Sequence, residues 1–299
     1  MASKKKREKQ RQIEALREEK IAKEKLLDFD NFKPKNEKQR ELYNSLLHTP
    51  MVVAYGSAGS GKSFIGVEVA LKLLFAKSIK RIYLTTPPIP VGQTMGFNPG
   101  TPQEKLSHWL APVITHICNR IGLPLYRKLL TECKIILSPL ETMKGLSCER
   151  AFVYLDEAQE ATLEQLTMVS TRVGKRSTLF INGDLQQTNS KVKGGGFKIF
   201  IDAIRKENAD VAVILENSND FDEIPNWKTI HIPVIEFTDD YCVRSLLCRK
   251  MLYIISKISS NDLDYNGLTI INKSLQNLNT KCLFGLLLHD SKLLYKWGE

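Results

Sequence analysis

The segment Gly56-Ser-Ala-Gly-Ser-Gly-Lys-Ser63 constrains this chain more than any other, because it fits the pattern G-x-x-x-x-G-K-[ST] at every fixed position. The apolar run Met51–Tyr55 before it predicts a short buried strand, and the apolar stretch after it predicts a helix. A strand, a glycine-rich turn and a helix N-terminus together form a cradle of backbone N–H groups for phosphate. Glycine suits such a turn because it adopts φ values that other residues avoid. The pattern predicts a nucleoside triphosphate site, with an ordinary glycine turn as the alternative.

Every residue of this loop is a predicted contact of the nucleotide. Lys62 is expected to reach the β- and γ-phosphates, and the Ser63 hydroxyl is expected to be a ligand of Mg²⁺. The predicted phosphate-binding residues are Gly56, Ser57, Ala58, Gly59, Ser60, Gly61, Lys62 and Ser63.

Composition narrows the class of partner. The chain has 299 residues, 42% of them hydrophobic, which is enough for a core in one large or two small domains. Its formal net charge of +10 favours a polyanionic partner such as nucleic acid. No apolar run approaches the ~20 residues of a membrane span, and no signal peptide is recognisable, so we expect a cytoplasmic protein. The six cysteines are scattered without a C-x-x-C pair, which predicts reduced thiols rather than a zinc site.

The N-terminal segment, residues 1–34, is predicted to be a basic arm, either helical or disordered. Its first 27 residues contain ten Lys or Arg and five Glu, with a thin apolar stripe. Such an arm contributes salt-sensitive contacts to phosphates, or it serves only as a solubilising extension. The sequence leaves both alternatives open.

Beyond the arm, short apolar runs alternate with helical patterns. This alternation predicts an α/β fold with a mostly parallel sheet covered by helices on both faces. In such folds, ligand-binding and catalytic residues lie at the carboxyl ends of the strands. The predicted strands are Met51–Tyr55, Arg81–Thr85, Lys134–Leu137, Ala151–Leu155, Thr178–Asn182 and Val211–Leu215. The predicted helices are Lys38–Leu47, Phe64–Ala76, Gln103–Arg120, Leu163–Arg172 and Phe197–Lys206.

Two carboxylates, Asp156 and Glu157, follow directly on the predicted strand Ala151–Leu155. Asp156 is expected to hold Mg²⁺ through its water shell, and Glu157 to polarise the water that attacks the γ-phosphate. In-line hydrolysis needs one charge at the metal and another beyond the γ-phosphate, so adjacent carboxylates at a strand end suit it. A surface acidic pair that only ends a strand is the alternative. Gln159 is a further candidate, for coupling the nucleotide state to a neighbouring polymer site.

Gln187 is the third element of the predicted site. It lies in Gly183-Asp-Leu-Gln-Gln187, directly after the predicted strand Thr178–Asn182. An uncharged amide donates to a phosphate oxygen and accepts from water, so Gln187 is expected to sense the γ-phosphate or its water. A plain polar turn at the end of the strand is the alternative.

Taken together, these motifs resemble the PhoH family, whose core is the first RecA-like domain of superfamily-one helicases. The resemblance runs from about Gln39 to Arg244, roughly two-thirds of the chain. Beside the phosphate loop and Asp156-Glu-Ala-Gln159, it rests on further ordered motifs. These are Asn36-Glu-Lys-Gln39 with Tyr43, Thr86-Pro87, Gly92-Gln93, Gly96-Phe-Asn-Pro-Gly100 with Glu104-Lys105, Pro139-Leu140, Lys144-Gly145, Thr171-Arg-Val-Gly174, Gly183-Asp-Leu-Gln-Gln187 and Asp240-Tyr-Cys-Val-Arg244.

The resemblance implies a single RecA-like P-loop NTPase domain over residues 35–258, with ATP and Mg²⁺ as cofactors and Gln39 as the reader of adenine. Residues 259–299 match nothing in the family and are left unassigned. The chain departs from the family pattern at Thr86-Pro87, around Gly145 and at Asn189. These departures spare the nucleotide site but affect expected arginine contacts, and they are typical of phage-encoded members.

Two arginines, Arg172 and Arg244, are candidates for stabilising charge in the transition state. An arginine supplied by a neighbouring subunit raises phosphoryl-transfer rates by about 10³–10⁵. A single RecA-like domain lacks the second lobe that closes over ATP, so we expect a homo-oligomer, a ring or a filament, with a hexameric ring among the forms left open. An ordinary surface or capping role is the alternative for each arginine.

Two segments are candidate contacts for single-stranded RNA or DNA. The loop Thr86–His108 is rich in Gly and Pro, and Phe97 within it and Trp109 after it offer stacking surface to bases. Gly194–Gly196 lies among lysines and is either a flexible basic site or a linker.

Two functions from different classes fit these observations. The first is an ATPase coupled to single-stranded RNA or DNA, resembling a helicase or translocase. The second is a nucleotide-dependent interaction module that binds ATP and recruits a partner without remodelling nucleic acid. The intact pair Asp156-Glu157 favours the enzyme.

Overall fold

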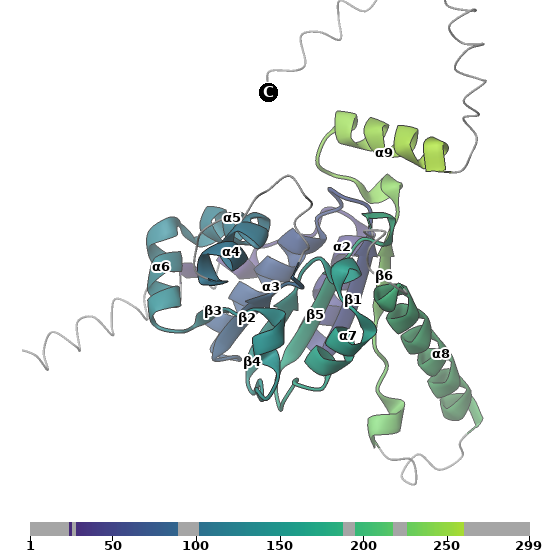
Figure 1. The fold of residues 1–299 in the computed structure, drawn as a ribbon, viewed down its shortest axis with the longest axis horizontal. Helices are drawn as coiled ribbons and strands as arrows, with labels where there is room; N and C mark the ends of the chain where they lie inside the picture. The colour runs from purple at the N-terminus through teal and green to yellow at the C-terminus, as the bar shows by residue number, and fades with distance from the viewer. Residues whose placement is uncertain (1–23, 26–27, 89–101, 188–194, 218–225, 260–299) are drawn as a thin grey trace, which may run out of the picture. The chain divides into compact units, whose positions relative to one another are not determined.

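The computed structural model describes residues 24–25, 28–88, 102–187, 195–217 and 226–259 (Figure 1). These residues contain a six-stranded parallel sheet in the order β3-β2-β4-β5-β1-β6. The strands are β1 (Met51–Gly56), β2 (Arg81–Thr85), β3 (Ile135–Leu137), β4 (Ala151–Leu155), β5 (Thr178–Gly183) and β6 (Val234–Phe237). The α/β fold class expected from the sequence is confirmed.

Helices cover both faces of the sheet, as the alternation predicted (Figure 1). The α-helices are α2 (Glu37–His48), α3 (Lys62–Phe75), α4 (Pro102–Trp109), α5 (Ala111–Ile121), α6 (Leu123–Thr131), α7 (Leu163–Ser170), α8 (Gly196–Asn217) and α9 (Leu246–Ser259). Short 3₁₀ segments are η1 (Leu140–Met143), η2 (Ala158–Glu160), η3 (Leu185–Gln187), η5 (Asn226–Thr229) and η6 (Asp239–Tyr241). Among the residues described, no helix is both long and apolar enough to traverse a bilayer.

Two hydrophobic cores lie on the two faces of the sheet. Successive strand residues point to opposite faces, so Val52 and Ala54 pack with α2, α3 and α5, whereas Val53 packs in the core beneath α7 and α8. Both faces are fully covered, which explains why the central strands are nearly continuous in apolar residues.

The predicted strand Val211–Leu215 is wrong, because these residues lie within α8. The segment continues the helical pattern of the preceding residues without a glycine or proline to end it. Val211 is buried and Val213 is 57% exposed, which a strand covered on both faces would not allow.

The sixth strand is instead β6, at the edge of the sheet beside β1. Its residues alternate, with Ile235 and Phe237 buried and Glu236 exposed. The sequence prediction sought continuous apolar runs and therefore missed an edge strand that faces solvent on one side.

The helical boundaries also differ from those expected. The predicted helix Gln103–Arg120 is divided into α4 and α5, since the chain turns at Leu110 and a proline occupies the first turn of α5. The sequence prediction missed α6, which begins after Gly122, again with a proline in its first turn.

The packed part of the chain begins before residue 35, where we expected the domain to start. Phe29 is 1% exposed and stacks on Phe75, with ring centroids 5.7 Å apart. Asp30 forms an ion pair with Lys72 at 2.8 Å. The basic residues expected to form the rest of the arm lie largely outside the described residues.

The chain divides into two compact units, residues 1–245 and residues 246–299. The first contains the whole sheet. The second contains α9, and the expected domain of residues 35–258 stays a prediction. The unassigned residues 260–299 lie outside the described part.

Candidate functional site

The phosphate loop follows β1 and enters α3 without regular structure of its own. Gly59 and Gly61 have φ values of +76° and +88°, and Gly61 is the N-cap of α3. No side chain caps this helix, so its first backbone N–H groups remain available at its positive end. This is the geometry that binds phosphate.

Two glycines are required because other groups approach their backbone closely. A Cβ added at Gly56 would lie 2.1 Å from the carbonyl oxygen of Phe237, and one added at Gly61 would lie 2.6 Å from Gln39 Nε2. Only glycine fits at these positions without a local rearrangement.

Lys62 is folded back onto the loop. Its Nζ donates to the carbonyl oxygens of Gly56 and Ser57 at 2.6 and 2.9 Å and to Ser60 Oγ at 3.2 Å. Burial lowers the pKa of Lys62 to about 8, although nearby carboxylates, led by Asp184 and Asp156, oppose the shift. The lysine is therefore held as a buried cation beside the phosphate-binding backbone.

Asp156 and Ser63 are joined by Asn182, at the end of β5. Asn182 Nδ2 donates to Asp156 Oδ1 at 2.6 Å and to Ser63 Oγ at 3.2 Å. The strand order places β5 between β4 and β1, so Asn182 lies between the two predicted metal ligands. The sequence prediction did not assign Asn182, although a polar residue at the end of an apolar strand was an available signal.

Burial, followed by the neighbouring charge of Glu157, raises the pKa of Asp156 to about 6, while the hydrogen bond from Asn182 opposes the shift. Tyr154 OH also donates to Asp156 Oδ1 at 3.3 Å. A cation bound beside such a carboxylate would stabilise its ionised form, because it would compensate the buried negative charge.

The oxygen atoms present fit Mg²⁺. A hydroxyl and one carboxylate are hard ligands, and Mg²⁺ commonly takes one or two carboxylates together with substrate phosphates and water. Asn182 Oδ1 is buried with no hydrogen-bond partner in the described structure, which leaves a further oxygen beside the pair. Within the described residues, no group of three or more His, Cys, Asp or Glu could hold a metal without such added ligands.

Glu157 occupies a left-handed turn directly after β4, with φ of +53°. Gln159 Nε2 donates to Glu157 Oε2 at 2.6 Å, and Gln159 Oε1 accepts from the backbone N–H of Asp184 at 2.9 Å. Gln159 therefore connects the carboxylate to the turn after β5 and fixes its orientation. Gly183 leaves room for this bridge, since a Cβ there would lie 3.0 Å from Gln159 Oε1.

Gln187 is the last residue of η3, shortly after Asp184 in the chain. Its side chain lies outside the described part of the structure, as do the lysines before Gly194 and most of the loop Thr86–His108, with Phe97. The expectations for these residues remain predictions.

Gln39 is buried against the phosphate loop. Its Nε2 donates to the carbonyl oxygen of Ser60 at 2.8 Å, and its Oε1 accepts from the backbone N–H of Lys35 at 2.9 Å. One N–H and one lone pair of the amide remain for a ligand. The residue thus supports the loop whether or not it also contacts a base.

The segment after β6 runs along the phosphate loop, which the sequence prediction did not anticipate. Ser57 N–H donates to Phe237 O at 2.8 Å, and the Ser57 hydroxyl donates to Asp239. The N–H of Val243 donates to Gly59 O at 2.9 Å. Arg244, the next residue, is exposed beside the loop of its own chain.

Arg172 lies elsewhere. Its carbonyl accepts from the N–H of Cys148, three residues before β4 begins, at 2.9 Å. This is the amino edge of the sheet, whereas the phosphate loop is at the carboxyl edge. The structure does not bring Arg172 to the nucleotide site of its own chain.

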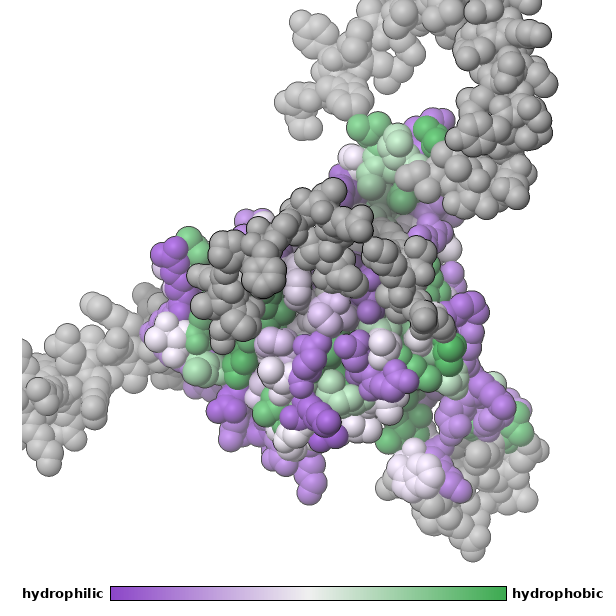
Figure 2. Space-filling model, in the orientation of Figure 1, coloured by the Kyte–Doolittle hydropathy of each residue, from purple (hydrophilic) through white to green (hydrophobic). Residues whose placement is uncertain are grey.

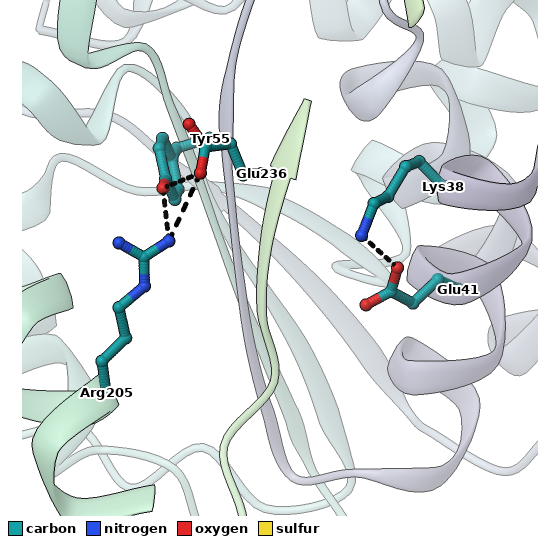
Figure 3. A network of polar contacts seen from close by, with 5 residues as sticks. All are labelled: Lys38, Glu41, Tyr55, Arg205 and Glu236. Atoms are coloured by element: carbon teal, nitrogen blue, oxygen red, sulfur yellow. Dashed lines mark hydrogen bonds and ion pairs between the residues drawn. The ribbon is translucent and has the colours of Figure 1, made fainter. Parts of the chain in front are cut away.

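A surface network joins the strand before the loop to its neighbours (Figure 3). Tyr55 OH donates to Glu236 Oε2 at 2.7 Å and accepts from Arg205 Nη2 at 2.6 Å. Burial, followed by the hydrogen bond to Glu236, raises the pKa of Tyr55 to about 12. The network connects β1, β6 and α8, and so supports the strand that leads into the phosphate loop.

Comparisons of the sequence with known proteins found similar families and proteins. The model of the family described as "PhoH-like protein" matches residues 31–256. Protein PhoH of Escherichia coli (strain K12) is 29% identical over 224 residues, which cover 74% of this chain and 57% of that protein. The PhoH-like protein of Mycobacterium tuberculosis (strain ATCC 25618 / H37Rv) is 34% identical over 155 residues, which cover 52% of this chain and 44% of that protein.

The chain thus spans about half the length of the curated relatives it matches. A solved structure of the large terminase from a thermophilic bacteriophage is also similar, with 12% identity and a TM-score of 0.45. That match covers 74% of this chain and 50% of the terminase chain.

Proposed function

This chain belongs to the PhoH family, and on that premise we propose that it binds ATP with Mg²⁺, hydrolyses it, and couples hydrolysis to single-stranded RNA or DNA. The observation that carries the proposal is the cluster of Lys62, Ser63, Asp156 and Glu157 at one edge of the sheet. Each is placed there by a strand end or by the loop, and each has the chemistry that phosphoryl transfer needs.

The phosphate loop binds and orients the triphosphate in this proposal. Backbone N–H groups of the loop and of the first turn of α3 donate to phosphate oxygens. Lys62 exchanges its bonds to the carbonyl oxygens of Gly56 and Ser57 for bonds to the β- and γ-phosphates. These carbonyl contacts keep the cation at the site before the ligand arrives.

Ser63 and Asp156 would hold Mg²⁺, which neutralises charge on the phosphates when bound. Asn182 positions both side chains, since one amide group donates to each. Tyr154 adds a second donor to Asp156. All four side chains, Ser63, Asp156, Asn182 and Tyr154, are buried or partly buried. Water therefore does not compete for the hydrogen bonds that orient them.

Glu157 is the proposed general base. Its carboxylate accepts the proton of the attacking water, and Gln159 holds it toward the turn after β5. Gln187 follows on that turn and is the proposed sensor of the γ-phosphate. Gln159 is thereby placed to transmit a change at the turn to the base.

Coupling to single-stranded RNA or DNA is supported by the net charge of +10 and by the helicase-like motif order. We further propose a cytoplasmic homo-oligomer, a ring, in which an arginine of a neighbouring copy approaches the site. Arg172 suits that role only at the nucleotide site of a neighbouring copy, because it lies at the opposite edge of its own sheet. Arg244 already lies beside the loop of its own chain.

The test is the ATP turnover of the full chain with and without single-stranded RNA and DNA, over a range of protein concentrations. We expect turnover that nucleic acid stimulates and that rises per chain as the protein associates. Turnover that neither polymer changes would favour the interaction module that binds ATP and recruits a partner. Absence of ATP hydrolysis under all conditions would refute the enzyme.

A further inference from the structure

The amino edge of the sheet, opposite the phosphate loop, is strongly basic. We define the basic edge as residues 77–81, 132–134, 149–150 and 172–176, which are the turns that lead into β2, β3, β4 and β5. They hold eight basic and two acidic side chains, which gives a net charge of +6. The net charge of the whole chain is +10. The basic residues are Lys77, Lys80, Arg81, Lys134, Arg150, Arg172, Lys175 and Arg176.

Backbone hydrogen bonds hold these turns side by side. The N–H of Lys80 donates to Arg150 O, and the N–H of Arg150 donates to Lys175 O at 3.0 Å. Arg150 Nη2 donates to Lys77 O at 2.9 Å. Because β2, β4 and β5 are neighbours about 4.8 Å apart, the cations form a row along the edge.

The charge of this row is largely uncompensated. Among the residues that the structure describes, Lys134 is the only member of the eight with a carboxylate partner, Glu132 at 2.7 Å. Lys80, Lys175 and Arg176 are exposed. In Figure 2, hydrophilic residues of every kind lie along the lower rim of the part that contains the sheet; the sign of the charge comes from the sequence. Such a concentration of like charge favours an anionic partner.

Three of the basic residues also adopt backbone conformations that favour glycine. Lys77, Arg150 and Arg176 have φ values of +59°, +48° and +56°. Glycine would adopt them without steric conflict between Cβ and backbone. The chain carries a long cation at each position instead, which is consistent with a role for the side chains themselves.

We propose that the basic edge binds the phosphate backbone of single-stranded nucleic acid. The proposal rests on the proposed coupling to RNA or DNA. It adds a phosphate-binding surface at the edge of the sheet opposite ATP to the candidate contacts predicted from the sequence. A row of cations on adjacent turns, five of them exposed and three partly buried, matches the regular charge of a phosphate backbone better than it matches one carboxylate cluster. Phosphate contacts carry no base information, so binding is independent of sequence and sensitive to salt.

The test is the affinity of the full chain for labelled oligouridylate and oligothymidylate, measured by fluorescence anisotropy over a series of salt concentrations. The test variant is Lys80→Gln/Lys175→Gln/Arg176→Gln. We expect affinity to fall by on the order of a hundredfold at about 0.1 M salt, and the salt slope to fall by about 2, since each phosphate contact on a single strand contributes about 0.7.

The matched control is Arg40→Gln/Arg127→Gln/Lys206→Gln, which removes the same charge from exposed residues outside every segment suggested to contact nucleic acid. We expect it to change affinity by less than about threefold, the effect of net charge alone. An equal loss in both variants would overturn the proposal, as would unchanged affinity in the test variant. A test variant that binds oligonucleotide normally but no longer self-associates in sedimentation would instead assign this edge to a second copy of the chain.

The variant Arg176→Gly tests whether a loss of oligonucleotide affinity arises from the missing side chain or from damaged folding. Glycine relieves the left-handed conformation at this position, so we expect the melting temperature to hold or rise while oligonucleotide affinity falls. A fall in both would attribute the loss to damaged structure and contradict the proposal. ATP turnover without nucleic acid is measured on the same samples, so failure of this surface and failure of the proposed ATPase are distinguished.

Discussion

The two edges of the central sheet differ in how far their charged side chains are buried. At the carboxyl edge, Lys62, Asp156 and Asn182 are buried, and burial shifts the pKa values of the lysine and the aspartate. At the amino edge, the basic side chains are mostly exposed, and backbone hydrogen bonds hold their turns together. The first arrangement orients a small ligand for chemistry, whereas the second suits a long polyanion that is held without fixed geometry.

The largest difference between the two edges is expected when the buried cation at the carboxyl edge, Lys62, is removed. We expect Lys62→Ala to weaken ATP binding by about a hundredfold or more, since two or more charge-assisted hydrogen bonds to phosphate are lost. Isothermal titration calorimetry measures the change. Lys80→Ala at the amino edge is the control and should bind ATP as the natural chain does; equal losses in both variants would mean that ATP is held by charge alone.

Removal of the proposed base should separate binding from turnover. We expect Glu157→Gln to retain ATP while its turnover falls by about 10²–10⁴, the range typical of general bases. Glu149→Gln, at the amino edge, should leave both unchanged. Single-turnover hydrolysis of radiolabelled ATP measures the rate, and normal hydrolysis by Glu157→Gln would refute the assignment of the base.

A third substitution should improve stability while it removes function. Asp156 is buried with its pKa raised to about 6, so its charge destabilises the free protein at neutral pH. We expect Asp156→Asn to increase the free energy of unfolding by on the order of 2 kcal/mol without nucleotide or metal, and to abolish turnover.

The pH dependence provides the check. Because the pKa in the folded state, about 6, lies above the unfolded value, protonation stabilises the native chain as the pH falls through that value. The difference between Asp156→Asn and the natural chain should therefore shrink between about pH 7 and about pH 4. Urea denaturation at each pH measures it, and a difference that widens on acidification would contradict the buried-charge account.

The smallest effect is expected at the surface network beside the loop. Tyr55→Phe removes one hydroxyl, but Glu236 and Arg205 are about half exposed and can bond to water. We expect the free energy of unfolding to fall by about 1 kcal/mol, with ATP affinity nearly unchanged. Urea denaturation and calorimetry measure the two quantities. A large loss of ATP affinity would show that this network controls the loop.

The sequence predicted most of the fold because its strongest signals are local. Five strands are continuous apolar runs, and the phosphate loop is an unbroken pattern between a strand and a helix. The strand β6 was missed because solvent covers one of its faces and Glu236 interrupts its apolar residues. The segment Val211–Leu215 was misassigned because a short apolar run at the end of a helix has the composition of a strand.

The contacts between motifs were harder to predict because they depend on strand order. Asn182 joins Ser63 to Asp156 only because β5 lies between β4 and β1. Likewise, the turns of the basic edge are far apart in the chain, and adjacent strands bring them together. No pattern within one segment carries either arrangement.

The most direct test of the account is the stimulation of ATP turnover by single-stranded RNA and DNA. It is compared between the natural chain, the basic-edge variant Lys80→Gln/Lys175→Gln/Arg176→Gln and the control Arg40→Gln/Arg127→Gln/Lys206→Gln. The account predicts equal turnover in all three without nucleic acid, and stimulation that is retained in the control but lost in the basic-edge variant. Equal stimulation of all three chains at every salt concentration would contradict it.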